Sequence, residues 1–98
     1  MSQAFRLSRE APRVLGVGGE LTFATAAAAL PAIVQALAAE PCDRLDLAGV
    51  ERSDSAGLAC VLAVQADMAQ RGRPLQVSNV PAGMRALALV CEVDGLMA

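Results

Sequence analysis

The chain alternates between stretches with strand periodicity and stretches with helix periodicity, and this alternation limits its fold more than any other feature. Strands are expected near residues 5–9, 13–21, 44–50 and 73–80, and helices near residues 25–40, 58–70 and 81–90. Strands that alternate with helices of about 10–15 residues form parallel or mixed sheets. The turn Ala11-Pro12-Arg13 makes a hairpin of the first two strands. We therefore expect an α/β domain of order β-β-α-β-α-β-α, with a mixed sheet of four to five strands and helices mainly on one face.

The first predicted helix carries one apolar stripe at the spacing i, i+3, i+4, i+7. The stripe consists of Leu30, Ile33, Val34 and Leu37. Thr25 is the expected N-cap, and Pro41 ends the helix. Pro31 fits the first turns if the helix begins late, and it kinks the helix if the helix begins near Ala26.

The remaining elements follow from similar signals. The second helix ends at Gly72, and the third begins with Pro81. Residues 93–96 are typical of a turn that leads to a further short element, and Gly18-Gly19 indicates a bulge or a close backbone approach. In the second helix, one side is shared by Leu58, Val61, Leu62, Gln65 and Met68. The third helix carries Met84, Leu87, Leu89 and Val90.

Length and composition favour one small domain over residues 1–98. The chain has 98 residues, and 55% of them are hydrophobic, but 21 are Ala and only 2 are Phe. The core must therefore be built from Leu, Val, Ile and Met. The 8 basic residues, all Arg, are scattered and outnumbered by 10 acidic ones. This pattern excludes the basic surface of a nucleic-acid-binding domain.

The residue types needed for catalysis are missing. The chain contains no His, so Ser55 beside Asp54 has no general base to activate it, and no Lys can take that role. We expect no enzyme, no cofactor and no metal site. Asp43, Asp46 and Asp54 are interpreted as solvated carboxylates, with Asp46 facing away from the strand's apolar side.

The three thiols, Cys42, Cys60 and Cys91, show no CxxC spacing and are interpreted as packing residues in a reducing cytoplasm. Met68 and Met84 are interpreted in the same way, as residues that fill gaps in the core.

One segment has nearly the length of a membrane span. Residues 21–39 carry no charge, but they are rich in Ala, contain Thr, Pro and Gln, and lack close cationic flanks. We interpret this segment as a helix of a soluble domain. The first ten residues also lack the apolar run of a signal peptide, which favours a cytoplasmic protein.

The informative junction lies between a predicted strand end and a predicted helix start, at Asp54-Ser55-Ala56-Gly57-Leu58. Asp and Ser are residue types that cap helix N-termini, and Gly57 permits a close approach to neighbouring backbone. Simple capping explains these residues. A recognition surface explains them as well, because ligands of open α/β sheets bind at the carboxyl ends of strands. Both interpretations stay open from the residues alone.

These residues resemble the signature of the STAS domain family (sulfate transporter and anti-sigma factor antagonist). The resemblance lies in the strand Leu45–Val50, in the Asp54-Ser55-Ala56-Gly57-Leu58 junction and in the closing residues 87–96. It implies the STAS fold over nearly the whole chain. In anti-sigma factor antagonists, a kinase phosphorylates the hydroxyl residue immediately before the Gly, and here that position is Ala56.

A hydroxyl residue at the Ser55 position is instead similar to the small STAS subunits of bacterial Mla-type ABC transporters. This resemblance implies a cytoplasmic, non-enzymatic subunit that binds the transporter ATPase through residues 54–58 and supports phospholipid transport for lipid asymmetry. Such a subunit lies at the inner membrane only through its complex, and it can form a homodimer when isolated. The alternative is an anti-sigma factor antagonist that an anti-sigma kinase phosphorylates at Ser55. Phosphate there is favoured by the helix N-terminus and disfavoured by Asp54.

Overall fold

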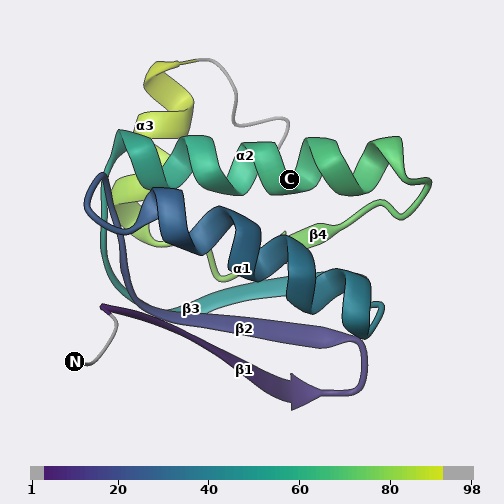
Figure 1. The fold of residues 1–98 in the computed structure, drawn as a ribbon. Coiled ribbons are helices and arrows are strands. Elements are labelled where there is room, and N and C mark those ends of the chain that lie inside the picture. The colour runs from purple at the N-terminus through teal and green to yellow at the C-terminus, as the bar shows by residue number, and fades with distance from the viewer. Residues whose placement is uncertain (1–3, 92–98) are drawn as a thin grey trace.

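The computed structural model describes residues 4–91 (Figure 1). Its elements are β1 (Phe5–Ala11), β2 (Val14–Leu21), α1 (Ala26–Ala39), β3 (Arg44–Ser53), α2 (Ser55–Gln70), β4 (Gln76–Ser78) and α3 (Ala82–Val90). The strands form one sheet in the order β1-β2-β3-β4, in which β1 is antiparallel to β2 and the other pairs are parallel. This arrangement confirms the predicted mixed α/β fold, with four strands in the described part of the chain.

The core lies between the sheet and the helices. In Figure 1, α1 and α2 lie side by side over one face of the sheet, and α3 packs beside the N-terminal half of α2. Alternate residues of β2 and β3 meet the inner sides of α1 and α2, because side chains of a strand alternate between its two faces. The fully buried members of this layer include Leu15, Val17, Leu45, Leu47, Ile33, Leu37, Val61 and Val64. Burial of each large apolar side chain contributes about 1.5–3 kcal/mol.

The junction between β3 and α2 is shorter than the sequence predicts. Residues 51–57 were expected as a loop, but β3 continues to Ser53 and α2 begins at Ser55. The cause is pairing with β2, since Arg52 lies opposite Glu20 and Ser53 lies opposite Leu21. The predicted strand at 73–80 is also too long, because only Gln76–Ser78 pairs with β3 at this edge of the sheet.

The start of α1 differs from the expected cap. Thr25 occupies the N-cap position, but its side chain makes no cap hydrogen bond. Its hydroxyl instead donates to the Glu20 carbonyl at 3.0 Å and accepts from the Thr22 N–H at 2.9 Å. Because α1 begins at Ala26, Pro31 lies inside the helix. Pro31 is exposed, so water can reach the backbone that loses a hydrogen bond there.

Two glycine predictions are confirmed, and α3 is only partly buried. Gly72 follows α2 with φ +73°, and Gly19 has φ +82° at a place where a Cβ would overlap the Ala4 carbonyl. In α3, Met84 is buried, but Leu89 and Val90 are 60% and 81% exposed. These two residues lie on the outer side of α3. The predicted turn at 93–96 lies outside the described residues.

In α2, the predicted inner side is confirmed for Leu58, Val61 and Met68, while Leu62 and Gln65 lie half-buried at its margin.

Candidate functional site

The N-terminus of α2 is separated from β3 by one residue, Asp54. Its Oδ1 accepts hydrogen bonds from the N–H groups of Ala56 at 3.0 Å and Gly57 at 3.1 Å. These donors have no partner inside the helix, so the predicted capping role of Asp54 is confirmed. Its Oδ2 accepts the N–H of Phe23 at 3.0 Å, a contact that the sequence did not predict. One carboxylate therefore fixes both the start of α2 and the loop before α1.

These backbone contacts keep Asp54 ionised. The hydrogen bond from Phe23 does most to lower the pKa of Asp54 below its ordinary value, and those from Gly57 and Ala56 act in the same direction. Partial removal from water opposes them without reversing the shift. At neutral pH the helix N-terminus therefore carries a fixed negative charge beside it.

Gly57 brings the first turn of α2 against the end of β2. A Cβ on Gly57 would overlap the carbonyl oxygen of Leu21, which is backbone and cannot rotate away. The predicted close approach is thus confirmed, and its partner is Leu21. The contact fixes the height of α2 above the sheet and so the position of Ser55.

The predicted partner-binding residues divide into accessible and buried ones. Ser55 is exposed, while Asp54 and Ala56 are half-exposed. No group within residues 4–91 hydrogen-bonds to the Ser55 hydroxyl. Gly57 and Leu58 are buried in this chain, Leu58 at 4% exposure. They position the corner, and the surface that a second molecule can reach consists of Asp54, Ser55 and Ala56.

An apolar groove of about 630 Å³ begins at this corner and runs between α1 and α2. It is lined by Phe23, Ala26, Ala27, Leu30, Ala56, Ala59, Cys60 and Ala63. Sequence reasoning did not single out Phe23, whose side chain is 85% exposed, whereas Phe5 is 5% exposed in the core. The available signal was its place in the short turn between Thr22 and Thr25 rather than inside a periodic segment.

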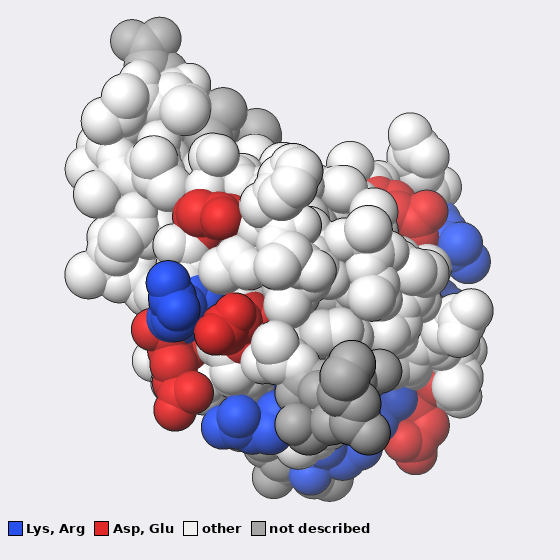
Figure 2. Space-filling view, turned by 60° about the vertical axis from the view of Figure 1, so that its left-hand side comes forward, with Lys and Arg blue, Asp and Glu red and all other residues white. Residues whose placement is uncertain are grey.

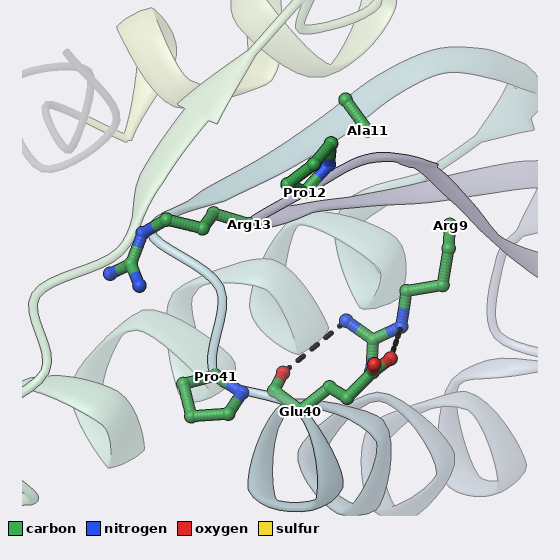
Figure 3. Close-up of a pocket in the computed structure, with 6 residues that line it drawn as sticks. All are labelled: Arg9, Ala11, Pro12, Arg13, Glu40 and Pro41. Atoms are coloured by element: carbon green, nitrogen blue, oxygen red, sulfur yellow. Dashed lines mark hydrogen bonds and ion pairs between the residues drawn. The ribbon is translucent and has the colours of Figure 1, made fainter.

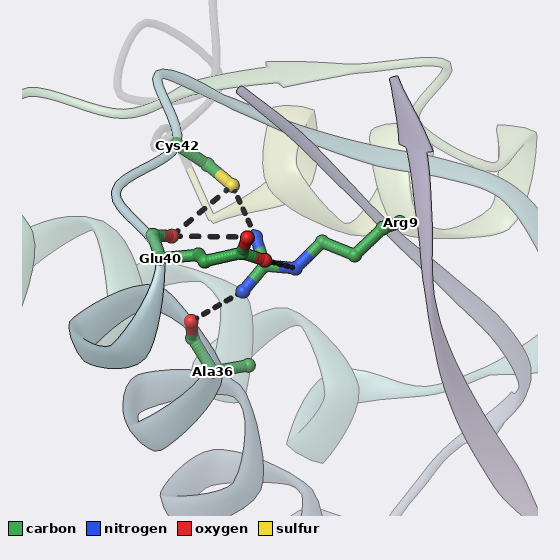
Figure 4. Close-up of polar contacts among 4 residues, drawn as sticks. All are labelled: Arg9, Ala36, Glu40 and Cys42. Atoms are coloured by element: carbon green, nitrogen blue, oxygen red, sulfur yellow. Dashed lines mark hydrogen bonds and ion pairs between the residues drawn. The ribbon is translucent and has the colours of Figure 1, made fainter. Parts of the chain in front are cut away.

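A second concavity, of about 520 Å³, lies at the opposite end of α1 and is lined by three charged residues, Arg9, Arg13 and Glu40, and by three apolar ones (Figure 3). There Arg9 of β1 reaches the C-terminal end of α1. Its Nη2 donates to the Ala36 carbonyl at 2.6 Å, and its Nε pairs with the Glu40 carboxylate at 3.0 Å. Its Nη1 lies 2.6 Å from the Cys42 sulfur and 3.3 Å from the Glu40 carbonyl (Figure 4). The guanidinium satisfies the last carbonyls of α1 and neutralises the negative end of this helix. The concavity is therefore explained by a structural contact between β1 and α1.

The other carboxylates and thiols have structural surroundings. Asp43 pairs with Arg13 at 2.9 Å, chiefly through a hydrogen bond that lowers the pKa of Asp43. Asp46 accepts hydrogen bonds from the Ala48 N–H and the Asn79 amide, so it is not simply solvated. Within residues 4–91, no three Cys, Asp or Glu side chains could hold a metal ion together.

Cys42 and Cys60 are buried, as expected of packing residues, and burial raises the pKa of Cys60. Cys91 is exposed, so its interpretation as a packing residue was wrong. Met68 and Met84 are buried as predicted.

No helix among the described residues has the length and apolar character needed to cross a bilayer. Residues 21–39 instead include the end of β2 and all of α1.

A family model described as "Mlab, STAS domain" matches residues 4–98. The chain belongs to the STAS domain family. Members of this family generally act through protein–protein interactions. No curated protein sequence matches the chain.

Solved structures share the STAS fold with this chain at low sequence identity. The anti-sigma factor antagonist SpoIIAA in its unphosphorylated form is 16% identical, with a TM-score of 0.70 over 94% of this chain and 84% of its own. An anti-sigma factor antagonist from Mycobacterium paratuberculosis is 23% identical, with a TM-score of 0.68 over 94% and 80%. A sulfate transporter family protein from Wolinella succinogenes is 17% identical, with a TM-score of 0.65 over 88% and 70%.

Proposed function

We propose that this STAS domain is the small subunit of a Mla-type phospholipid ABC transporter and binds the transporter ATPase through the corner at Asp54, Ser55 and Ala56. The subunit has no reaction chemistry of its own, and it lies in the cytoplasm at the inner membrane through its complex. The observation that carries the proposal is the Ser55 hydroxyl, which stands exposed on a helix start held in place by Asp54 and Gly57. A rigid, accessible and unreactive surface is what docking of another protein requires.

Two further observations support this function. The family model that matches residues 4–98 carries the Mla name in its description. In addition, Asp54 uses both carboxylate oxygens as acceptors of backbone N–H groups, and within residues 4–91 no hydrogen bond joins it to the Ser55 hydroxyl. The chain supplies no His or Lys in its place. The proposal therefore assigns Ser55 a contact role.

The experiment is reconstitution of phospholipid transfer with and without this protein. The permease and ATPase of the Mla-type transporter from the same organism are placed in vesicles, and transfer of a fluorescent phospholipid to acceptor vesicles is measured. The proposal expects stable co-purification of this chain with the ATPase and faster transfer when it is present. An ATPase that neither binds the chain nor responds to it would refute the proposal.

The second candidate is an anti-sigma factor antagonist, and the structural similarity to SpoIIAA favours it. In this case a kinase transfers the γ-phosphoryl group of ATP to the Ser55 oxygen, the hydroxyl proton is released to solvent, and ADP leaves. The exposed hydroxyl permits the transfer, but the phosphate would meet the ionised Asp54. Intact-mass analysis after incubation with ATP and a cognate anti-sigma kinase decides between the candidates, because only the second predicts a phosphoryl adduct at Ser55.

A further inference from the structure

The loop between β2 and α1 is held by one buried hydroxyl. Among residues 4–91, Thr25 is the polar side chain that is buried, at 7% exposure. Its hydroxyl accepts the Thr22 N–H and donates to the Glu20 carbonyl. The Thr22 carbonyl in turn accepts the N–H groups of Thr25 at 3.0 Å and Ala26 at 2.8 Å. Both peptide groups of Thr22 are therefore fixed by the start of α1.

One peptide group joins this loop to the start of α2. The Thr22 carbonyl and the Phe23 N–H belong to the same planar peptide, so they point in nearly opposite directions. The carbonyl faces the start of α1, and the Phe23 N–H donates to Oδ2 of Asp54 at 3.0 Å. The other oxygen of Asp54 accepts the N–H groups of Ala56 and Gly57. The starts of the two helices are therefore linked through one peptide and one carboxylate.

Hydrogen bonds, rather than ion pairs, hold Asp54 in this network. Figure 2 brings forward the side of the molecule on which α1 and α2 begin, and uncharged side chains fill the middle of that face. Within residues 4–91, no Arg forms an ion pair with Asp54. Of the three backbone N–H groups that reach its carboxylate, only that of Phe23 comes from outside α2. The orientation of Asp54 relative to α1 therefore depends on this one donor.

We propose that Thr25 is a positioning residue of the docking corner at residues 54–56. Its hydroxyl orients the peptide that binds Asp54, and the Asp54 carboxylate places Ser55 at the start of α2. This inference rests on the proposed function and adds a residue that acts on the same surface from the interior. Because Thr25 is buried, a partner does not reach it, and its effect on binding must pass through Asp54.

Two matched variants test this role. Thr25→Val removes the hydroxyl with little change of shape, and Thr22→Val makes the same change in the same loop, where no group within residues 4–91 hydrogen-bonds to the hydroxyl. The dissociation constant for the purified ATPase is measured by biolayer interferometry. We expect Thr25→Val to weaken binding by about 10-fold and Thr22→Val by less than about 3-fold. Thr25→Ser, which keeps the hydroxyl, should bind within about 3-fold of the wild type.

The state of Asp54 can be measured without the ATPase. The Phe23 N–H does most to lower the pKa of Asp54, so this pKa, followed by NMR of the carboxyl carbon, should rise in Thr25→Val and stay unchanged in Thr22→Val. In the wild type, the amide hydrogens of Phe23, Ala56 and Gly57 bind the same carboxylate, and hydrogen exchange should show protection of all three. A Phe23 amide that exchanges as fast as in an unfolded peptide would overturn the inference.

A double-mutant cycle tests whether Thr25 acts through Asp54. If it does, the loss of affinity in the variant that combines Thr25→Val with Asp54→Ala should be clearly smaller than the product of the two single losses. A loss equal to that product would overturn the inference, because Thr25 would then act by another route.

The outcomes separate this inference from the proposed function. If Thr25→Val and Thr22→Val bind the ATPase equally well and share one Asp54 pKa, the positioning role is overturned while the function stands. If the wild type does not bind the ATPase, the proposed function fails, and the Asp54 pKa and the amide exchange decide the role of Thr25. Thermal unfolding shows whether each variant is folded. If Thr25→Val does not fold, the amide exchange of the wild type decides.

Discussion

The N-terminus of α2 and the C-terminus of α1 are both helix ends closed by a side chain from elsewhere in the chain, yet they leave different surfaces. At α1, Arg9 supplies a cation to the carbonyl end of the helix, and at α2, Asp54 supplies an anion to the N–H end. Both choices follow the helix dipole. They differ in which polar groups stay accessible to a second molecule after the backbone groups of the helix end are hydrogen-bonded.

At the end of α1 few polar groups stay accessible, because all three nitrogens of the Arg9 guanidinium contact Ala36, Glu40 or Cys42. At the start of α2, the Asp54 carboxylate is equally occupied, but the next residue, Ser55, presents an exposed hydroxyl that no group within residues 4–91 binds, beside an apolar groove. A capped helix end is therefore not in itself a site. The accessible groups that the cap holds in place are the reason why we propose the start of α2 as a docking site.

Gly57→Ala tests the rigidity of the α2 start and should have the largest effect on stability. Its Cβ would overlap the Leu21 carbonyl, so α2 must lift from β2. We expect the free energy of unfolding to fall by about 3 kcal/mol in urea denaturation. The control is Gly83→Ala in α3, where a Cβ meets nothing within 4 Å. This variant should gain about 0.5–1 kcal/mol, and equal losses in both would contradict the account.

Arg9→Ala tests the other helix end and should have a medium effect. The variant leaves the Ala36 and Glu40 carbonyls without their cation, and the side chain is 34% exposed, so we expect a loss of about 1–2 kcal/mol. Arg9→Lys should recover part of it. Affinity for the ATPase should stay unchanged in both variants. A binding defect at wild-type stability would assign a functional role to this end as well.

Asp54→Asn should have the smallest effect on stability at neutral pH. The contribution of the Asp54 charge is detected by comparing the stability of the variant and the wild type as the pH is lowered. Since backbone N–H groups lower the pKa of Asp54 in the folded chain, its charge stabilises the fold above the unfolded value of about 3.9. This contribution is lost as the pH falls through the folded-state pKa. The stability difference between wild type and Asp54→Asn should therefore narrow below about pH 4. A difference that stays constant from pH 7 to pH 3 would show that the charge is not involved.

The sequence predicts features that depend on neighbours along the chain, such as the order of the elements, the cap at Asp54 and the glycine after α2. It does not predict features that depend on distant pairing. Glu51, Arg52 and Ser53 are polar enough to suggest a loop, and only their pairing with β2 makes them strand. Arg9 binds the carbonyls of Ala36 and Glu40, 27 and 31 residues away at the end of α1, and no local pattern indicates these contacts.

The local structure of the candidate site was predicted to a similar extent, while its role as a docking site stays a prediction. The corner at residues 54–58 was located by its capping residues, but the burial of Leu58 and the exposure of Phe23 depend on how α1 and α2 pack. Leu89 and Val90 lie outside the core because they fall at i+5 and i+6 from buried Met84, off the stripe that contains Leu87 and Ala88.

The most direct test of the docking corner is the affinity of the purified ATPase for Ser55→Arg compared with Ser8→Arg. Both serines are exposed, but Ser8 lies in β1, away from the corner. Both variants should keep wild-type stability within about 0.5 kcal/mol, as surface substitutions do. We predict that Ser55→Arg weakens binding by about 30-fold or more, and that Ser8→Arg changes it by less than about 3-fold. Equal affinity of the two variants would contradict a docking role for Ser55.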